Sequence, residues 1–93
     1  MAKKTDVQKL LSKHDKLNHT EQLVVVSHVQ RNEDDWYVNT LMVRGYEVPF
    51  KFRRRKLYKN LEGAMVNLTY YPMVEMIAGI EFEAMKVVRI KVS

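Results

Sequence analysis

Residues 36–54 read WYVNTLMVRGYEVPFKFRR, and two stretches rich in β-branched and aromatic residues flank the pair Arg44-Gly45 in them. Such side chains favour strands, and glycine supplies the positive φ that a two-residue hairpin loop needs. We therefore predict a hairpin with strands over residues 36–43 and 46–54. The second strand alternates between apolar and polar residues, and its apolar side should face the core. That side consists of Tyr46, Val48, Phe50 and Phe52.

A two-residue loop would also fix the register of this hairpin. Val43 would pair with Tyr46, and Trp36 would then stand opposite Arg53 on the outward face. Lys51 would lie one pair away, with Arg55 following at the strand end. Pro49 on the same face cannot donate a ladder hydrogen bond, so it predicts an edge position or a bulge.

The sequence on either side of the hairpin predicts three more strands. Residues 23–26 are apolar on both faces, which predicts a central strand over about 22–31. Residues 56–62 predict a short helical turn, closed by Gly63, with Leu57 and Leu61 pointing inward. A strand over 64–71 would end at Pro72, followed by a loop or a single helical turn. Residues 80–92 predict a long last strand, whose change of apolar phase indicates a bulge near residues 84–86.

Residues 5–17 predict an amphipathic helix with Asn18 as its end. Its apolar stripe consists of Val7, Leu10, Leu11, His14 and Leu17, and its opposite face carries Lys9, Lys13 and Lys16. Such a stripe usually packs on the domain's own core. The alternative is a partner-binding helix or one that forms a homodimer.

The predicted order is a helix, three strands, a short helix and two strands. This order resembles that of the OB-fold, a five-stranded Greek-key barrel, over residues 22–92. The resemblance implies a mainly β protein, a single domain over residues 1–93, with a helix over 5–18 and an OB-like barrel over 22–92. An SH3-like barrel, which also has five strands, is the alternative. The long first and fifth strands and the helical turn between the third and fourth favour the OB-like barrel.

Composition narrows the functional classes. The chain has no cysteine, which excludes disulfides, thiolate zinc sites and cysteine nucleophiles. We expect a cytoplasmic protein without a membrane span, because a signal-peptide core and an apolar run of about 20 residues are both lacking. The three histidines do not have the spacing of metal ligands, and no nucleophile or phosphate-loop motif is present. We therefore predict a binding module that is not an enzyme, with no catalytic residue, metal or cofactor.

Residues 44–60 carry most of the excess charge. They contain seven Lys or Arg and one acid, a charge of +6, whereas the whole chain is +5. OB-folds bind oligonucleotides on the face of strands two and three, where part of this segment would lie. The prediction is weak, largely sequence-independent binding of single-stranded DNA or RNA, through phosphate contacts and base stacking. The predicted site is Trp36, Lys51, Arg53, Arg54, Arg55, Lys56 and, as a second stacking residue, Tyr71.

Two alternatives to this interpretation remain open. Trp36 could form a cation–π pair with Arg53 and take no part in binding. The basic run could instead meet an acidic protein partner, which would make the chain a protein–protein adaptor.

Overall fold

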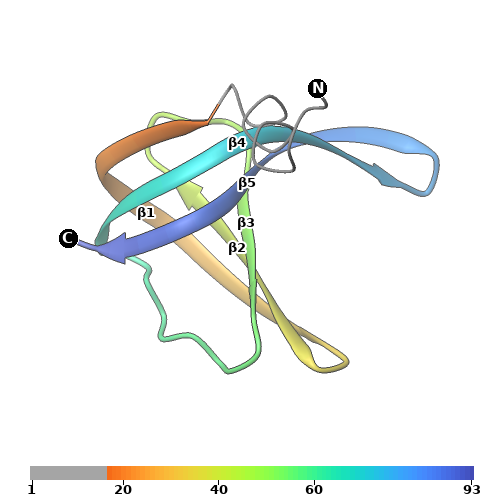
Figure 1. The fold of residues 1–93 in the computed structure, drawn as a ribbon, viewed down its shortest axis with the longest axis horizontal. Helices are drawn as coiled ribbons and strands as arrows, with labels where there is room; N and C mark the ends of the chain where they lie inside the picture. The colour runs from red at the N-terminus through yellow and green to blue at the C-terminus, as the bar shows by residue number, and fades with distance from the viewer. Residues whose placement is uncertain (1–16) are drawn as a thin grey trace, which may run out of the picture.

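The computed structural model describes residues 17–93, which form five strands (Figure 1). The strands are β1 (Asn18–Glu33), β2 (Trp36–Val43), β3 (Phe50–Arg54), β4 (Met65–Ile77) and β5 (Ile80–Val92). The predicted helix over residues 5–17 lies outside the described residues, apart from Leu17. Asn18 does not end a helix as predicted, because it begins β1.

The five strands close in a ring in the order β1-β2-β3-β5-β4, with β4 paired back to β1. Four of the pairings are antiparallel, and β3 pairs with β5 in parallel through Phe50–Met85 and Lys51–Lys86. The predicted mainly β, five-stranded architecture is therefore confirmed for residues 17–93. Where a strand of the ring is paired on both sides, it offers no free edge to another chain.

The core fills the inside of this ring. It consists of Leu23, Val25, Leu41, Val43, Phe50, Phe52, Leu61, Val66, Leu68, Tyr70 and Val87. Phe50 and Phe52 are buried as predicted, and Phe50 meets Tyr70 edge-to-face with ring centroids 4.9 Å apart. The Tyr70 hydroxyl bonds that of Thr20 at 2.9 Å. Burial raises the pKa of the Tyr70 phenol, and the Thr20 bond works against that rise.

The predicted register of the β2–β3 hairpin is wrong by two residues. A turn does form at Arg44-Gly45, where Gly45 has a φ of 90° and Tyr46 N–H donates to the Val43 carbonyl at 3.2 Å. Residues 46–49 then leave the ladder, and β3 begins only at Phe50, opposite Leu41. Pro49 explains the departure, because it has no N–H to donate to β2. A shift of two residues preserves the alternation, so the predicted inward and outward faces of β3 hold.

β1 is longer than predicted and is bulged. It pairs with both β2 and β4, which agrees with the predicted central strand. The register with β2 shifts between Val25 and Ser27, so Val26 is an extra residue. Before this bulge the odd-numbered residues Leu23 and Val25 point into the core. After it the even-numbered residues do, beginning with His28, because the extra residue shifts the alternation by one.

The predicted helical turn over residues 56–62 is wrong, because side chains of β1 hold this connection in an extended form. The side-chain amide of Gln30 bonds both the N–H (2.8 Å) and the carbonyl of Tyr58. Leu61 N–H donates to His28 Nδ1 at 2.9 Å. These bonds satisfy backbone groups that a helix would otherwise pair internally. Leu61 is buried as predicted, whereas Leu57 is 67% exposed.

The predicted end of β4 at Pro72 is wrong, and residues 73–77 form neither the predicted loop nor a helical turn. β4 runs on to Ile77, turns at Ala78-Gly79, where both residues have positive φ, and pairs with the start of β5. The β1–β4 ladder ends at Asn18–Tyr70, so Pro72 lies beyond it, where proline is tolerated. Residues 73–84 form a two-stranded arm that extends beyond the ring (Figure 1). The predicted bulge of β5 is found at Val88, two residues beyond the expected position.

Asn39 is buried, and its hydrogen bond to His28 of β1 links β2 to the β3–β4 connection, which His28 also contacts. The Leu61 bond makes His28 Nδ1 an acceptor, so His28 Nε2–H donates to Asn39 Oδ1 at 2.7 Å. Asn39 Nδ2–H donates to the Tyr37 carbonyl at 3.2 Å. We expect Asn39→Ala to lower the free energy of unfolding by about 1–3 kcal/mol, because it leaves buried polar groups without partners.

Urea denaturation measures this change, and Asn67→Ala is the matched control. Asn67 Oδ1 accepts a hydrogen bond from the exposed Gln22 N–H, which water can replace. The control should therefore cost distinctly less. Equal losses in the two variants would mean that the buried network does not stabilise the fold in this way.

Candidate functional site

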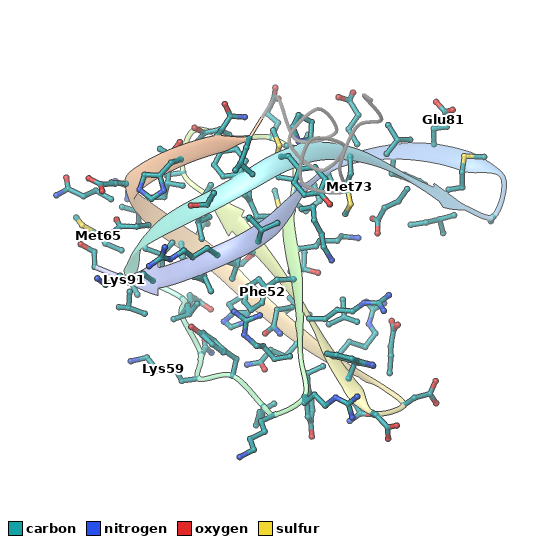
Figure 2. All side chains as sticks on the ribbon, viewed as in Figure 1. Phe52, Lys59, Met65, Met73, Glu81 and Lys91 are labelled. Carbon is teal, nitrogen blue, oxygen red and sulfur yellow. The ribbon has the colours of Figure 1, made fainter. Side chains whose placement is uncertain are left out.

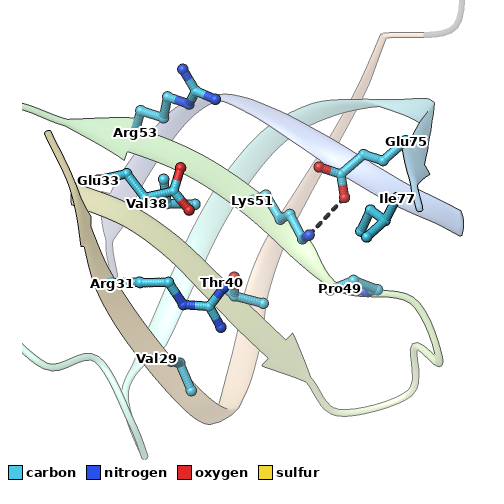
Figure 3. A pocket seen from close by; sticks show the side chains of 10 residues that line it. All are labelled: Val29, Arg31, Glu33, Val38, Thr40, Pro49, Lys51, Arg53, Glu75 and Ile77. Carbon is cyan, nitrogen blue, oxygen red and sulfur yellow. Dashed lines mark hydrogen bonds and ion pairs between the residues drawn. The ribbon is translucent and has the colours of Figure 1, made fainter. Parts of the chain in front are cut away.

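A groove of about 440 Å³ lies on the outer face of β1, β2 and β3, and the arm borders it (Figure 3). Alternate residues of a strand share a face, so each strand contributes a short row of side chains. The rows are Val29, Arg31 and Glu33 from β1, Val38 and Thr40 from β2, and Lys51 and Arg53 from β3. Pro49 and the arm residues Glu75 and Ile77 complete the lining.

The charges in this groove are mixed. Lys51 Nζ lies 2.6 Å from Glu75 Oε1, and both side chains are about one quarter to one third exposed (24% and 31%). This ion pair joins β3 to the arm and offsets the charge of Lys51. Arg31 and Arg53 make no ion pair with any residue in the range 17–93, so their charges remain available to a ligand.

A second hollow of about 210 Å³ adjoins the groove. It shares Lys51, Arg53 and Glu75 with the groove and extends to Lys86. Lys86 is the β5 partner of Lys51 in the parallel pairing, which explains their proximity. The continuous surface is therefore lined by four cations, Arg31, Lys51, Arg53 and Lys86, against two acids, Glu33 and Glu75.

Trp36 stands at the end of this groove, next to the β1–β2 turn. It pairs with Glu33, and paired residues share a face, so its ring lies on the groove side of the sheet. The Arg55 guanidinium lies 4.7 Å from the Trp36 ring centroid, a cation–π contact worth about 0.5–1 kcal/mol at the surface. Arg55 thus takes the position predicted for Arg53, as the two-residue shift in register requires. Trp36 as a whole is 37% exposed.

The remaining predicted site residues do not converge on the groove. Arg54 points to the other face of β3, where its guanidinium lies 5.0 Å from the Phe52 ring centroid. Lys56 is exposed in the β3–β4 connection. Tyr71 is half-buried and pairs with Lys86, while the preceding residue, Tyr70, faces the core. The structure thus brings together Lys51 and Arg53 in the groove, with Trp36 and Arg55 at its end.

The sequence analysis missed Arg31, Lys86 and Glu75. The bulge at Val26 shifts the inward–outward alternation of β1 by one residue, and Arg31 therefore points outward. No local sequence pattern predicts where that bulge lies. Lys86 did leave a signal, because it is the one charged residue among the apolar even positions of 80–92. Glu75 lay in a predicted loop, so its position on the arm could not be foreseen.

No group of three or more His, Asp or Glu within residues 17–93 is placed to hold a metal ion. In the same range no helix has the length and apolar character needed to cross a membrane. No family model, curated protein or solved structure matches this chain, so the site is interpreted from its own geometry.

The contact between Arg55 and Trp36 is directly measurable, because Trp36 is the only tryptophan of the chain. Arg55→Ala uncovers one face of the indole, and we expect faster quenching of its fluorescence by acrylamide. Lys59→Ala removes an equal charge from an exposed position in the connection and should leave quenching unchanged. Unchanged quenching in Arg55→Ala would show that the guanidinium does not cover the ring in solution.

Proposed function

We propose that this chain is a non-enzymatic module that binds single-stranded DNA or RNA in the groove. The observation that carries the proposal is the pair Arg31 and Arg53. These side chains lie in one groove on neighbouring parts of the sheet, and neither has an ionic partner among residues 17–93. Cations along a groove attract phosphates, and an aromatic ring at its end offers a base a surface to stack on.

The order of the strands supports the further proposal that the ring is an OB-like barrel. The chain passes through three consecutive strands, and β5 then inserts between β3 and β4. OB-folds bind oligonucleotides and oligosaccharides on the face of strands two and three. The groove lies on that part of this sheet, together with the adjoining residues of β1.

The contacts that we propose have distinct tasks. Arg31, Arg53 and Lys86 would hold successive phosphates, and Trp36 would stack on one base, worth about 1–3 kcal/mol. A phosphate near Lys51 would compete with the Glu75 carboxylate for the Lys51 ammonium group. Glu33 and Glu75 reduce the positive potential of the groove, so we expect weak binding with little sequence preference.

An acidic protein segment is the second candidate ligand. Val29, Val38 and Ile77 add apolar surface between the cations of the groove. This mixture also suits a peptide that carries both acidic and apolar side chains, and the chain would then be an adaptor.

Fluorescence anisotropy with a labelled single-stranded oligonucleotide, measured at several salt concentrations, tests the proposal. Replacing both Arg31 and Arg53 by Ala should weaken binding and flatten the salt slope by about 0.7 for each lost phosphate contact. Replacing both Lys56 and Lys59 by Ala removes the same charge outside the groove and should have a smaller effect. Trp36→Ala should weaken binding with little change in slope, because stacking releases no counterions.

Two results would contradict the nucleic-acid proposal. No binding of the wild-type chain at low salt would favour the acidic peptide, since electrostatic attraction is strongest there. Equal effects of the two double variants would mean that net charge, and not the groove, attracts the oligonucleotide.

A further inference from the structure

One face of the arm continues the lining of the groove. Glu75 and Ile77 line the groove (Figure 3). Residues paired directly across two strands share a face, so Phe82 stands beside Glu75, and Ile80 beside Ile77. We call the face with these four residues the inner face of the arm. Glu81 belongs to the opposite face and marks the far part of the arm in Figure 2.

Three large apolar side chains of the inner face are exposed. Ile77 is 50% exposed, Ile80 58% and Phe82 46%. Exposed apolar surface with polar residues beside it marks an interaction site on a small protein. Because this surface is continuous with the groove, a ligand that fills the groove can also reach the inner face.

The charges around the groove are divided between the sheet and the arm. Residues 73–84 contain three glutamates and neither Lys nor Arg. The unpaired cations of the groove, Arg31 and Arg53, belong to β1 and β3. A phosphate is therefore attracted to the sheet and repelled by the arm. A base is neutral and avoids that repulsion, and its flat face can stack on an aromatic ring such as that of Phe82.

We propose that the inner face of the arm binds bases of the single strand whose phosphates lie on Arg31 and Arg53, with Phe82 as a second stacking ring. This inference rests on the proposed function of the groove and adds an orientation to the ligand. The phosphates face the cations of the sheet, and a base lies against the apolar face of the arm.

The two stacking rings lie toward opposite ends of the groove. Trp36 stands at the end marked by Glu33 and Arg53, whereas Ile77 of the arm lies at the other end (Figure 3). The cations thus lie between two aromatic residues. Bases inside a duplex are stacked on each other and cannot reach either ring without leaving the helix. The arm should therefore favour single strands over duplexes.

Fluorescence anisotropy with a labelled single-stranded oligonucleotide measures the contribution of Phe82. We expect Phe82→Ala to weaken binding about fivefold or more, with little change in the salt slope, because stacking releases no counterions. Val74→Ala is the matched control, since Val74 is an exposed apolar residue on the opposite face of the arm, beside Glu83. The control should bind as tightly as the wild-type chain.

A relocated tryptophan reports the stacking directly. A variant with Trp36→Phe and Phe82→Trp carries its only indole on the inner face, and we expect the oligonucleotide to quench its fluorescence. A variant with Trp36→Phe and Val74→Trp carries the indole on the opposite face and should change little. Because Phe82 is about half exposed, its substitution should leave the fold intact, and urea denaturation of each variant checks this.

The outcomes separate this inference from the proposed function. If replacing Arg31 and Arg53 weakens binding while Phe82→Ala binds as tightly as Val74→Ala and the relocated indole is not quenched, the groove binds the oligonucleotide without the arm and the inference is wrong. No binding by the wild-type chain at low salt would overturn both. A wild-type dimer in sedimentation that Phe82→Ala dissociates would assign the inner face to a second copy, and would also overturn the inference.

Discussion

The parallel contact of β3 with β5 is the constraint on which the rest of the structure depends. It is short, with only Phe50–Met85 and Lys51–Lys86 in register, and Met85 N–H adds a 2.8 Å bond to the Pro49 carbonyl. Yet the ring depends on it, because the other four pairings alone leave β3 and β5 unjoined. Without it both strands would present open edges, and Phe50 would lose part of a burial worth about 1.5–3 kcal/mol.

The same contact creates the groove and limits its strength. Closure brings Lys51 and Lys86 side by side, and it holds the arm where Glu75 can reach Lys51. The acid stabilises two neighbouring cations that would otherwise repel each other, but it also occupies one of them. Arg31 and Arg53 are thus left as the unpaired cations of the groove among residues 17–93. A site of this kind suits a ligand that is bound loosely and released readily.

Local patterns predicted much of this architecture. The bounds of β2 and β5 follow from their composition, and the alternation around Phe50 and Phe52 identified the core face, because an even shift in register leaves faces unchanged. Contacts between distant residues were beyond such patterns. Gln30 holds Tyr58 in an extended connection, and nothing within residues 56–62 signals that bond. The candidate site was predicted in part for the same reason. The outward face of β3, with Lys51 and Arg53, was predicted correctly, although its register was not. The positions of Arg31 and Glu75 depend on a bulge and on an arm that continues past Pro72.

Titration of the ¹⁵N-labelled chain with an unlabelled single-stranded oligonucleotide, followed by amide chemical shifts, is the most direct test of the proposed groove. We predict the largest shifts at Arg31, Thr40, Lys51 and Arg53, together with the indole N–H of Trp36, which is a single signal in this chain. Residues on the opposite side of the ring, such as Asn67 and Lys91, should change little. Shifts concentrated in the β3–β4 connection around Lys56 and Lys59, with the groove unaffected, would contradict the account.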